Sequence, residues 1–587
     1  MAGDRNEDEY TPQHYKTLNI QPIYNLAEIC HRHGIKDVIL SPGSRCAPLT
    51  LAFARHPEIE CKTISDERSA AFIGLGMSQQ TKLPTALVCT SGSAALNYAP
   101  AIAEAYFQHI PLLVLTADRP PEWIDQYDGQ TIRQRDIYGK HVKESYQLPV
   151  DLENEESEWH CYRMLSEAIN TSLEYPAGPV HINLPFREPF YPQKDQITSY
   201  NKAVKVITQT GSRPVLPESE LKSLIDRWQN TQRKLIIGGQ GSLDDKLASI
   251  LEQLSATQKV PIIGDILSNL HQVDEVIAHS DVFLGQGKKG LAESLQPNLI
   301  VTFGKSTISK NLKLFLRNHP AVEHWHIQPA GSAADTFKSL TEVLHTTPEI
   351  FFSKLVETPP NEDFNTQKQE NFYHLWVIEE RKVRRVRESF FPQESLGEFE
   401  IVNEILEKTT DAHVHLANSM AVRYANFIGL NPNQSVEVFS NRGTSGIDGC
   451  TSTAVGSSMA SQKTTILITG DVAFFYDRNA FWHNYDLKHL KIVLLNNHAG
   501  GIFRMIQGPA DQPELEEFFE TRQTLSAKHL AEEFKVHYIN CDKRSKLKNQ
   551  IKEFFESSGP VILEIESDSQ QNKEILASFK EAYRLLD

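Results

Sequence analysis

The chain has 587 residues, of which 40% are hydrophobic and 23% charged. This composition is that of ordinary globular domains, and the length predicts three or four of them. The net charge of −16 argues against a general nucleic-acid surface. No apolar run reaches membrane-spanning length, the N-terminus is polar, and the seven cysteines form no Cys-x-x-Cys pair. We therefore expect a cytoplasmic protein with free thiols and neither a signal peptide nor a membrane anchor.

Residues 1–200 are predicted to form an α/β domain with a parallel sheet. The apolar run Thr85–Thr90 predicts a strand that leads into Ser91-Gly92-Ser93 and a helical stretch. Further strands are expected at 111–116 and 178–183. Arg45 and Arg119 stand in loops that follow probable strands, where they could converge on a cleft.

Residues 201–356 predict a central α/β domain with strands near 234–241, 261–264 and 298–302. The cluster Gly238-Gly-Gln-Gly241 lacks the full Gly-x-Gly-x-x-Gly spacing, so it does not indicate a dinucleotide site. Residues 357–395 are expected to be a linker that carries one charged helix.

Residues 396–587 contain the most informative stretch of the chain. Thr465–Thr469 predicts a strand that ends at Gly470-Asp471, and 492–495 predicts another that ends at Asn496-Asn497. Parallel strands joined by a helix place Asp471 and Asn497 at the same edge of a sheet, where α/β proteins bind ligands. A carboxylate, an amide carbonyl and a nearby main-chain carbonyl suit Mg²⁺. The alternative is a surface turn followed by an Asn-rich loop.

The first and last domains repeat one pattern. In each, a strand leads into a small polar turn, a helical stretch, a second strand and a later closing strand, 178–183 in one and 559–564 in the other. Two copies of one doubly wound βαβ domain on either side of the central domain fit this pattern. The predicted fold is therefore α/β, with three doubly wound parallel-sheet domains.

The Gly470-Asp471-…-Asn496-Asn497 pattern resembles the signature of thiamine diphosphate enzymes, with Val472 where that family usually has Gly. The resemblance implies that the first domain binds the pyrimidine ring of the cofactor, and that the last binds its diphosphate through Mg²⁺ or Mn²⁺. It also implies that Glu67 is catalytic and contacts ring nitrogen N1′. The alternative for Glu67 is a carboxylate at a helix N-terminus, where it stabilises the helix by about 0.3–1 kcal/mol. The implied cofactor-binding residues are Glu67, Ser91, Gly92, Ile447, Gly470, Asp471, Val472 and Asn497, and the implied metal ligands are Asp471, Asn497 and Ala499.

A series of motifs along nearly the whole chain narrows the family. They are Ser41-Pro-Gly-Ser-Arg45, Asp66-Glu-Arg68, Thr116-Ala-Asp-Arg-Pro-Pro-Glu122, Gln130-Thr-Ile-Arg-Gln134, Asn418-Ser-Met-Ala-Val-Arg423, Ser440-Asn-Arg-Gly-Thr-Ser-Gly-Ile-Asp448 and Gly500-Gly-Ile-Phe503. Together they resemble the 2-succinyl-5-enolpyruvyl-6-hydroxy-3-cyclohexene-1-carboxylate synthases of menaquinone biosynthesis. The resemblance implies a transferase that decarboxylates 2-oxoglutarate and adds the four-carbon unit to isochorismate. It also implies a homodimer or homotetramer with active sites between subunits.

Both implied substrates are dicarboxylates, which planar guanidinium groups bind through paired hydrogen bonds. Any one arginine alone would more often be a surface or ion-pair group. The resemblance implies the substrate residues Ser44, Arg45, Arg119, Gln130, Lys310, Ser419, Arg423, Arg442, Ile502 and Phe503. Asn311 stands where the family often has Arg after this lysine.

Two other functions remain open from the sequence. One is a pyruvate-using relative, such as an acetolactate synthase or a flavin-linked oxidase, although such enzymes have no need of several carboxylate-binding arginines. The other is a catalytically silent binding protein, against which the presence of Glu67, Asp471 and Asn497 argues.

Overall fold

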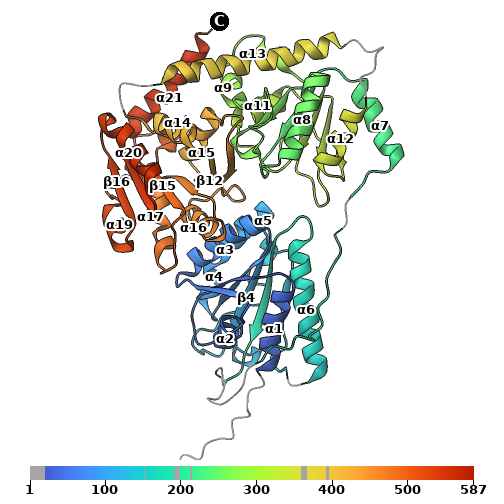
Figure 1. Cartoon of the computed structure of the whole chain (residues 1–587), viewed down its shortest axis with the longest axis vertical. Helices are drawn as coiled ribbons and strands as arrows, with labels where there is room; N and C mark the ends of the chain where they lie inside the picture. Colours follow the sequence, from blue (N-terminus) through green and yellow to red (C-terminus); the bar gives the residue numbers. More distant parts are fainter. Residues whose placement is uncertain are drawn as a thin grey trace, which may run out of the picture.

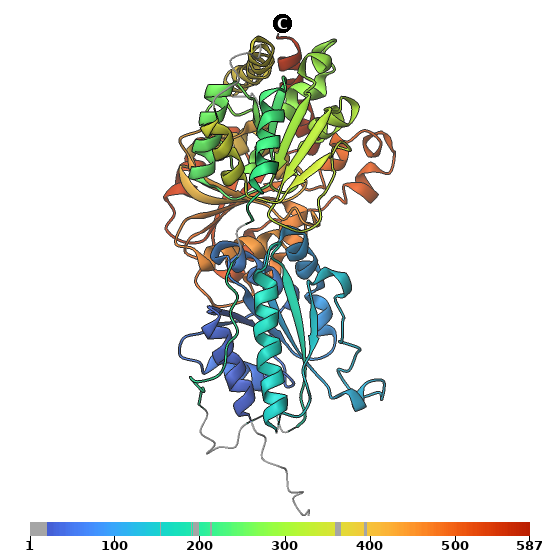
Figure 2. The same ribbon diagram turned by 90° about the vertical axis from the view of Figure 1, so that its right-hand side faces the viewer.

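A computed structural model of the chain describes residues 20–152, 154–188, 191, 199–211, 214–358, 366–391 and 396–586. These residues form three α/β units, each built on its own parallel sheet (Figure 1). The first unit occupies one end of the long axis, and the other two lie side by side at the opposite end (Figures 1 and 2). The prediction of three doubly wound parallel-sheet domains is confirmed.

The first sheet has the strand order β2-β1-β3-β4-β6-β5. Its strands are β1 (Asp37–Leu40), β2 (Glu60–Thr63), β3 (Thr85–Cys89), β4 (Leu112–Asp118), β5 (Ser145–Gln147) and β6 (Pro179–Pro185). Its α-helices are α1 (Gln21–Arg32), α2 (Ala47–Ala54), α3 (Glu67–Thr81), α4 (Ser93–Asn97), α5 (Ala99–Gln108) and α6 (Glu155–Leu173). Strands β3, β4 and β6 are buried along their whole length. Burial on both faces explains their continuous apolar sequence.

The third sheet has the order β13-β12-β14-β15-β17-β16. Its strands are β12 (Asp411–Leu416), β13 (Ser435–Phe439), β14 (Thr465–Gly470), β15 (Leu490–Asn496), β16 (His537–Cys541) and β17 (Val561–Glu566). Its α-helices are α14 (Glu398–Lys408), α15 (Met420–Ile428), α16 (Cys450–Ala460), α17 (Asp471–Tyr476), α18 (Ile502–Met505), α19 (Lys528–Phe534), α20 (Arg544–Glu556) and α21 (Ser569–Arg584). Numbered within each unit, the first and third sheets share one strand order, so the predicted repeat is confirmed.

The second sheet has the order β11-β10-β9-β7-β8. Its strands are β7 (Lys234–Gly238), β8 (Ile262–Gly264), β9 (Leu299–Phe303), β10 (Glu323–Ile327) and β11 (Glu342–Leu344). Its α-helices are α7 (Glu218–Gln229), α8 (Asp245–Gln258), α9 (Ser280–Phe283), α10 (Leu291–Leu295), α11 (Lys310–Asn318) and α12 (Pro348–Glu357).

A long helix, α13 (Gln367–Phe390), runs along the second and third units (Figure 1). It buries Phe372 and Trp376, and its Glu380 lies 2.6 Å from His279 of the second unit. The other ring nitrogen of His279 lies 2.9 Å from the Ile428 carbonyl of the third unit. The predicted linker thus contains a packed helix, whereas its residues 359–365 and 392–395 lie outside the described residues. The predicted domain boundaries at residues 200, 356 and 395 stay predictions.

The first and third units meet where α3 crosses α16. A Cβ atom on Gly76 would lie 2.0 Å from the Thr453 carbonyl oxygen, and one on Gly456 would lie 2.0 Å from that of Ile73. The glycines therefore allow the two helix backbones to touch. Of the helices in the described part of the chain, none is long and apolar enough to cross a membrane.

Candidate active site

A cavity of about 380 Å³ opens at the carboxyl ends of β12, β14 and β15. In a doubly wound sheet the strand order reverses at one point, here between β12 and β14, and the crevice at that point is where such folds bind ligands. Every site residue predicted in the last domain lines this cavity. Its lining includes Ser419, Arg423, Arg442, Ile447, Gly470, Asp471, Val472, Asn497, Ala499, Ile502 and Phe503.

Asp471 is the first residue of α17, directly after β14. It is 2% exposed, and its carboxylate accepts hydrogen bonds from the Val472 main chain at 2.8 Å and from Gln523 Nε2 at 2.7 Å. Burial raises the pKa of Asp471 to about 6. Because burial disfavours the ionised form, a cation beside this carboxylate would stabilise it.

Asn497 follows β15, whose Leu495 pairs with Gly470 in the sheet. Its Oδ1 accepts a hydrogen bond from the Ala499 main chain at 3.0 Å, and its Nδ2 donates to Glu398 at 2.7 Å. Two adjacent parallel strands thus bring Asp471 and Asn497 to one side of the cavity, as the spacing predicted.

Glu398 is a cavity residue that the sequence analysis missed. It is the first residue of α14, is almost fully buried, and also accepts a hydrogen bond from Ser567 Oγ at 3.2 Å. Burial, assisted by the nearby Asp471 carboxylate, raises the pKa of Glu398 to about 7. Nothing in the local sequence around Glu398 distinguishes it from an ordinary acid in a first helical turn.

The oxygen atoms on this side of the cavity suit a hard divalent cation. Among the described residues, no group of three or more His, Cys, Asp or Glu side chains could hold a metal ion by itself. The predicted ligands are instead one carboxylate, one amide and one carbonyl, which leave coordination positions for waters and phosphate oxygens, the arrangement that Mg²⁺ favours. Gly470 has open space where a Cβ would lie. The residues therefore fit a metal-bound diphosphate.

Two arginines bring positive charge to the lining of the same cavity. Arg423 on α15 donates from Nη1 to the Ser419 carbonyl, and Arg442 donates from Nη1 to Asn418 Oδ1 at 2.7 Å. Nε of Arg442 is buried and has no hydrogen-bond partner among the described residues. Burial lowers the pKa of both guanidinium groups, and for Arg423 the neighbouring charge of Arg442 adds to this effect. Two partly desolvated cations side by side favour an anionic ligand.

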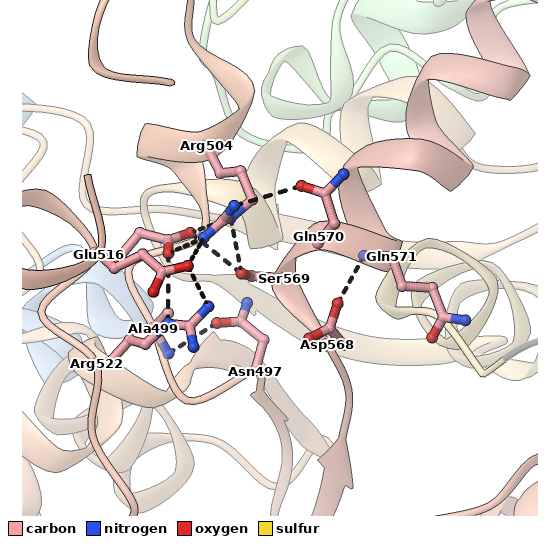
Figure 3. A network of polar contacts seen from close by, with 10 residues as sticks. Asn497, Ala499, Arg504, Glu516, Arg522, Asp568, Ser569, Gln570 and Gln571 are labelled. Atoms are coloured by element: carbon pink, nitrogen blue, oxygen red, sulfur yellow. Dashed lines mark hydrogen bonds and ion pairs between the residues drawn. The ribbon is translucent and has the colours of Figure 1, made fainter. Parts of the chain in front are cut away.

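Residues 499–503, which follow Asn497, contribute to the lining of the cavity. Arg504 comes directly after them and is the centre of a network of polar contacts (Figure 3). The Arg504 guanidinium donates to both carboxylate oxygens of Glu520, at 2.8 and 2.6 Å, and to Ser569 Oγ at 3.1 Å. Glu520 is fully buried, and its carbonyl oxygen accepts from the Gly500 main chain at 2.6 Å. This network positions the adjacent wall residues Ile502, Phe503 and Phe519.

The predicted residues of the first domain lie at the carboxyl edge of the first sheet. None of the described residues that line the cavity comes from residues 1–200. The loop of Ser44 and Arg45 lies against Thr90, since a Cβ on Gly43 would be 2.3 Å from the Thr90 Cβ. The Arg45 guanidinium is buried, with Nη1 donating to the Phe186 carbonyl at 2.9 Å.

Ser91, Gly92, Gln130 and Arg119 gather at this same edge. The Gln130 backbone lies 3.3 Å from where a Gly92 Cβ would be, and Arg119 pairs with Asp128 at 2.9 Å. The Ser91 hydroxyl is buried and has no hydrogen-bond partner among the described residues. An unpaired buried hydroxyl is costly, so this edge is suited to a ligand that supplies a partner.

Glu67 is the first residue of α3, but it does not cap that helix. The N-cap is Asp66, whose side chain accepts from the main-chain N–H groups of Arg68 and Ser69 at 3.0 and 3.3 Å. Glu67 instead accepts a hydrogen bond from Asn97 at 3.1 Å and is only partly buried. The hydrogen-bonding cap is therefore Asp66, while Glu67 lies in the first turn of α3, where its carboxylate also favours the helix N-terminus electrostatically.

Lys310 is exposed at the start of α11 and does not line the cavity. Asn311 is occupied within the second unit, where its main chain and Nδ2 donate to Asp281, each at 2.8 Å. Asn311, at the position where the family often has an arginine, thus donates its hydrogen bonds to Asp281.

Comparisons with known proteins agree with this architecture. Residues 25–137 match the model of the N-terminal TPP binding domain of thiamine pyrophosphate enzymes, residues 198–415 that of the middle domain, and residues 419–565 that of the C-terminal TPP binding domain. Thiamine pyrophosphate is another name for thiamine diphosphate.

Relatives named 2-succinyl-5-enolpyruvyl-6-hydroxy-3-cyclohexene-1-carboxylate synthase align over nearly their full length. The relative from Cytophaga hutchinsonii is 46% identical to this chain, and the alignment covers 96% of this chain and 98% of the relative. The relatives from Flavobacterium johnsoniae and Flavobacterium psychrophilum are 38% and 37% identical, and each alignment covers 94% of this chain and 97% of the relative. The chain belongs to the 2-succinyl-5-enolpyruvyl-6-hydroxy-3-cyclohexene-1-carboxylate synthase family of thiamine pyrophosphate enzymes.

Proposed function

We propose that the protein is a thiamine diphosphate-dependent transferase that decarboxylates 2-oxoglutarate and joins the four-carbon unit to isochorismate. The product would be the 2-succinyl-5-enolpyruvyl-6-hydroxy-3-cyclohexene-1-carboxylate of menaquinone biosynthesis. One observation carries the proposal: a single cavity is lined by Asp471 and Asn497 and also by Arg423 and Arg442. A site for a metal-bound diphosphate beside a site for carboxylates is what these reactants require.

Asp471, Asn497 and the Ala499 carbonyl would hold Mg²⁺ or Mn²⁺, and through it the cofactor diphosphate. Gly470 and Val472 would lie along the diphosphate, and Ile447 would support the bend of the cofactor between its two rings. When bound, thiamine diphosphate supplies the carbanion stabilisation that 2-oxo acid decarboxylation needs. Ile502 and Phe503 would shield that reaction from water.

The arginines would select dicarboxylates. Arg423 and Arg442 would bind the distal carboxylate of 2-oxoglutarate, with Ser419 beside them, whereas a pyruvate-using enzyme has no use for this pair. Arg45, Arg119, Ser44 and Gln130 would bind mainly isochorismate. Arg119 would then exchange its partner Asp128 for a substrate carboxylate. Lys310 would lie at the outer rim.

We further propose a homo-oligomer in which the first domain of one chain completes the cavity of another. Glu67, Ser91 and Gly92 would then contact the pyrimidine ring, with the Glu67 carboxylate holding a proton at N1′. Two observations support this proposal: Glu67 does not line the cavity of its own chain, and Phe107, Trp123 and Trp482 are about half exposed. Large exposed apolar side chains are typical of surfaces that a partner covers.

The test mixes the purified protein with thiamine diphosphate, Mg²⁺, 2-oxoglutarate and isochorismate, and follows CO₂ release and the loss of isochorismate absorbance. Repeated turnover, seen as CO₂ release beyond one equivalent per site together with loss of isochorismate, should require all four additions, and pyruvate should be a poor donor. Arg423→Ala should raise the KM for 2-oxoglutarate far more than that for isochorismate. The control is Arg163→Ala, which removes a surface arginine paired with Glu167 far along the chain from the cavity residues. Equal use of pyruvate and 2-oxoglutarate by the wild type would refute the proposal.

A further inference from the structure

The loop that carries Arg442 and Ile447 is held from outside its own domain. It joins β13 to α16, and its main chain meets Glu104 on α5 of the first unit. Glu104 Oε1 accepts from the Gly443 main chain at 2.7 Å, and Oε2 accepts from the Thr444 main chain and hydroxyl, both at 2.6 Å. Both carboxylate oxygens of Glu104 therefore accept hydrogen bonds from two consecutive residues of this loop.

A close approach of the two main chains accompanies these hydrogen bonds. A Cβ atom on Gly443 would lie 2.6 Å from the Glu104 carbonyl oxygen and 3.1 Å from the Phe107 Cβ. The contact with the backbone oxygen is too short for a Cβ atom, so a side chain at position 443 would push the loop away from α5. The position of the loop is thus set by α5 both through contact and through hydrogen bonds.

The same contact includes the second unit. Gln108 Nε2 donates to Glu104 Oε1 at 2.6 Å and to the Ser440 carbonyl at 3.1 Å. Gln240 Nε2 donates to Gln108 Oε1 at 3.1 Å and to the Ser440 carbonyl at 3.2 Å. Lys305 donates to the Gln108 carbonyl. All three units therefore meet at the start of the loop.

Arg442 is the residue directly before Gly443. The position of its main chain decides whether its guanidinium can reach both Asn418 and the cavity. Glu104 is 1% exposed, so water does not replace the hydrogen bonds that it makes. A buried carboxylate that accepts four hydrogen bonds fixes its donors more firmly than a solvated one.

We propose that Glu104 is a positioning residue for the substrate-carboxylate site. From another domain of the same chain, Glu104 holds the loop so that Arg442 points into the cavity. This role rests on the proposed function, because it acts through the binding of 2-oxoglutarate by Arg442. A simpler alternative is that Glu104 only joins two domains. The two roles differ in what the loss of Glu104 does to substrate binding.

The central variant is Glu104→Gln, which keeps the shape of the side chain. Its amide Nε2 would face the N–H of Gly443 or Thr444, and two donors in contact repel each other. The loop should shift, and the KM for 2-oxoglutarate should rise about ten-fold or more, the expected size for weakening one charge-assisted hydrogen bond. The KM for isochorismate and the thermal shift produced by thiamine diphosphate with Mg²⁺ should change little.

Two further variants separate positioning from stability. Glu380→Gln is the matched control, since Glu380 is a fully buried carboxylate at a domain contact, paired with His279 and not among the cavity residues. It should lower the melting temperature without raising the KM for 2-oxoglutarate. Thr444→Val removes only the hydroxyl bond to Glu104, and should raise this KM in the same direction by a smaller factor.

A double-mutant cycle with Arg442→Ala completes the test. Because Glu104 acts through Arg442, adding Glu104→Gln to Arg442→Ala should produce no further increase in the KM for 2-oxoglutarate. An unchanged KM in Glu104→Gln, or an equal increase in both backgrounds, overturns the positioning role while the proposed function stands. If Glu104→Gln does not fold, an unchanged KM in Thr444→Val overturns it. A wild type that releases no CO₂ from 2-oxoglutarate refutes the proposed function itself, and the positioning role with it.

Discussion

Replacing Glu398 with alanine should weaken metal binding although Glu398 is not itself a predicted ligand. Its carboxylate is the acceptor for Asn497 Nδ2 at 2.7 Å and for Ser567 Oγ at 3.2 Å. In Glu398→Ala the Asn497 amide would lose this acceptor and would be free to turn. Removing such a supporting partner typically costs about 10–100-fold in metal affinity, which corresponds to about 1.4–2.7 kcal/mol.

The assay is the melting temperature as a function of Mg²⁺ concentration at a fixed, saturating concentration of thiamine diphosphate. A ligand that binds only the folded state stabilises it by an amount set by its affinity, so the midpoint of the Mg²⁺ titration should move upward by about 10–100-fold. Glu398→Gln should shift the midpoint less, because its Oε1 can still accept from Asn497. Asp471→Ala should abolish the response.

The same helix supplies a matched control. Glu400 lies two residues farther along α14, is also buried, and pairs with Arg544 at 2.9 Å, but does not line the cavity. Glu400→Ala should lower the melting temperature without ligand and leave the Mg²⁺ midpoint unchanged. A wild-type midpoint in Glu398→Ala, or an equal shift in both variants, would refute the argument that Glu398 orients Asn497.

Three further outcomes are expected. Glu67→Gln should keep its thermal response to the cofactor but lose about 10²–10⁴-fold in turnover, as for a positioned acid–base group, and wild-type turnover would exclude a catalytic role. Mixing inactive Glu67→Gln and Asp471→Ala subunits should restore activity, since a mixed dimer contains one site without either lesion; no recovery in subunits shown to exchange would place each site within one chain. Burial raises the pKa of Asp477 to about 7. The stability from its protonated form is complete below the ordinary value of 3.8 and is lost as the pH rises through about 7. The melting temperature of the wild type should therefore fall relative to that of Asp477→Asn over this range, and a constant difference would contradict the assignment.

Much of the fold follows from the sequence because parallel sheets covered on both faces need continuous apolar strands. The runs at 85–90 and 465–469 correspond to β3 and β14 within a residue or two. The joint position of Asp471 and Asn497 was also predictable, since adjacent parallel strands end at one edge and Gly470 pairs with Leu495. The motifs identified the remaining cavity residues of the last domain by resemblance, and the structure brings them together.

Only the tertiary structure decided which neighbouring groups support that site. Glu398 contacts Asn497 across 99 residues, and Glu104 contacts Gly443 across 339, so no local pattern could pair them. Asp66 and Glu67 are adjacent acids in the sequence, and only backbone geometry assigns the helix cap to the first. Propensity and periodicity act over a few residues and set strands, helices and edges. The donors to a buried carboxylate are brought to it by the packing of whole domains. That packing determines how Glu104 supports the Arg442 loop and how Glu398 supports Asn497.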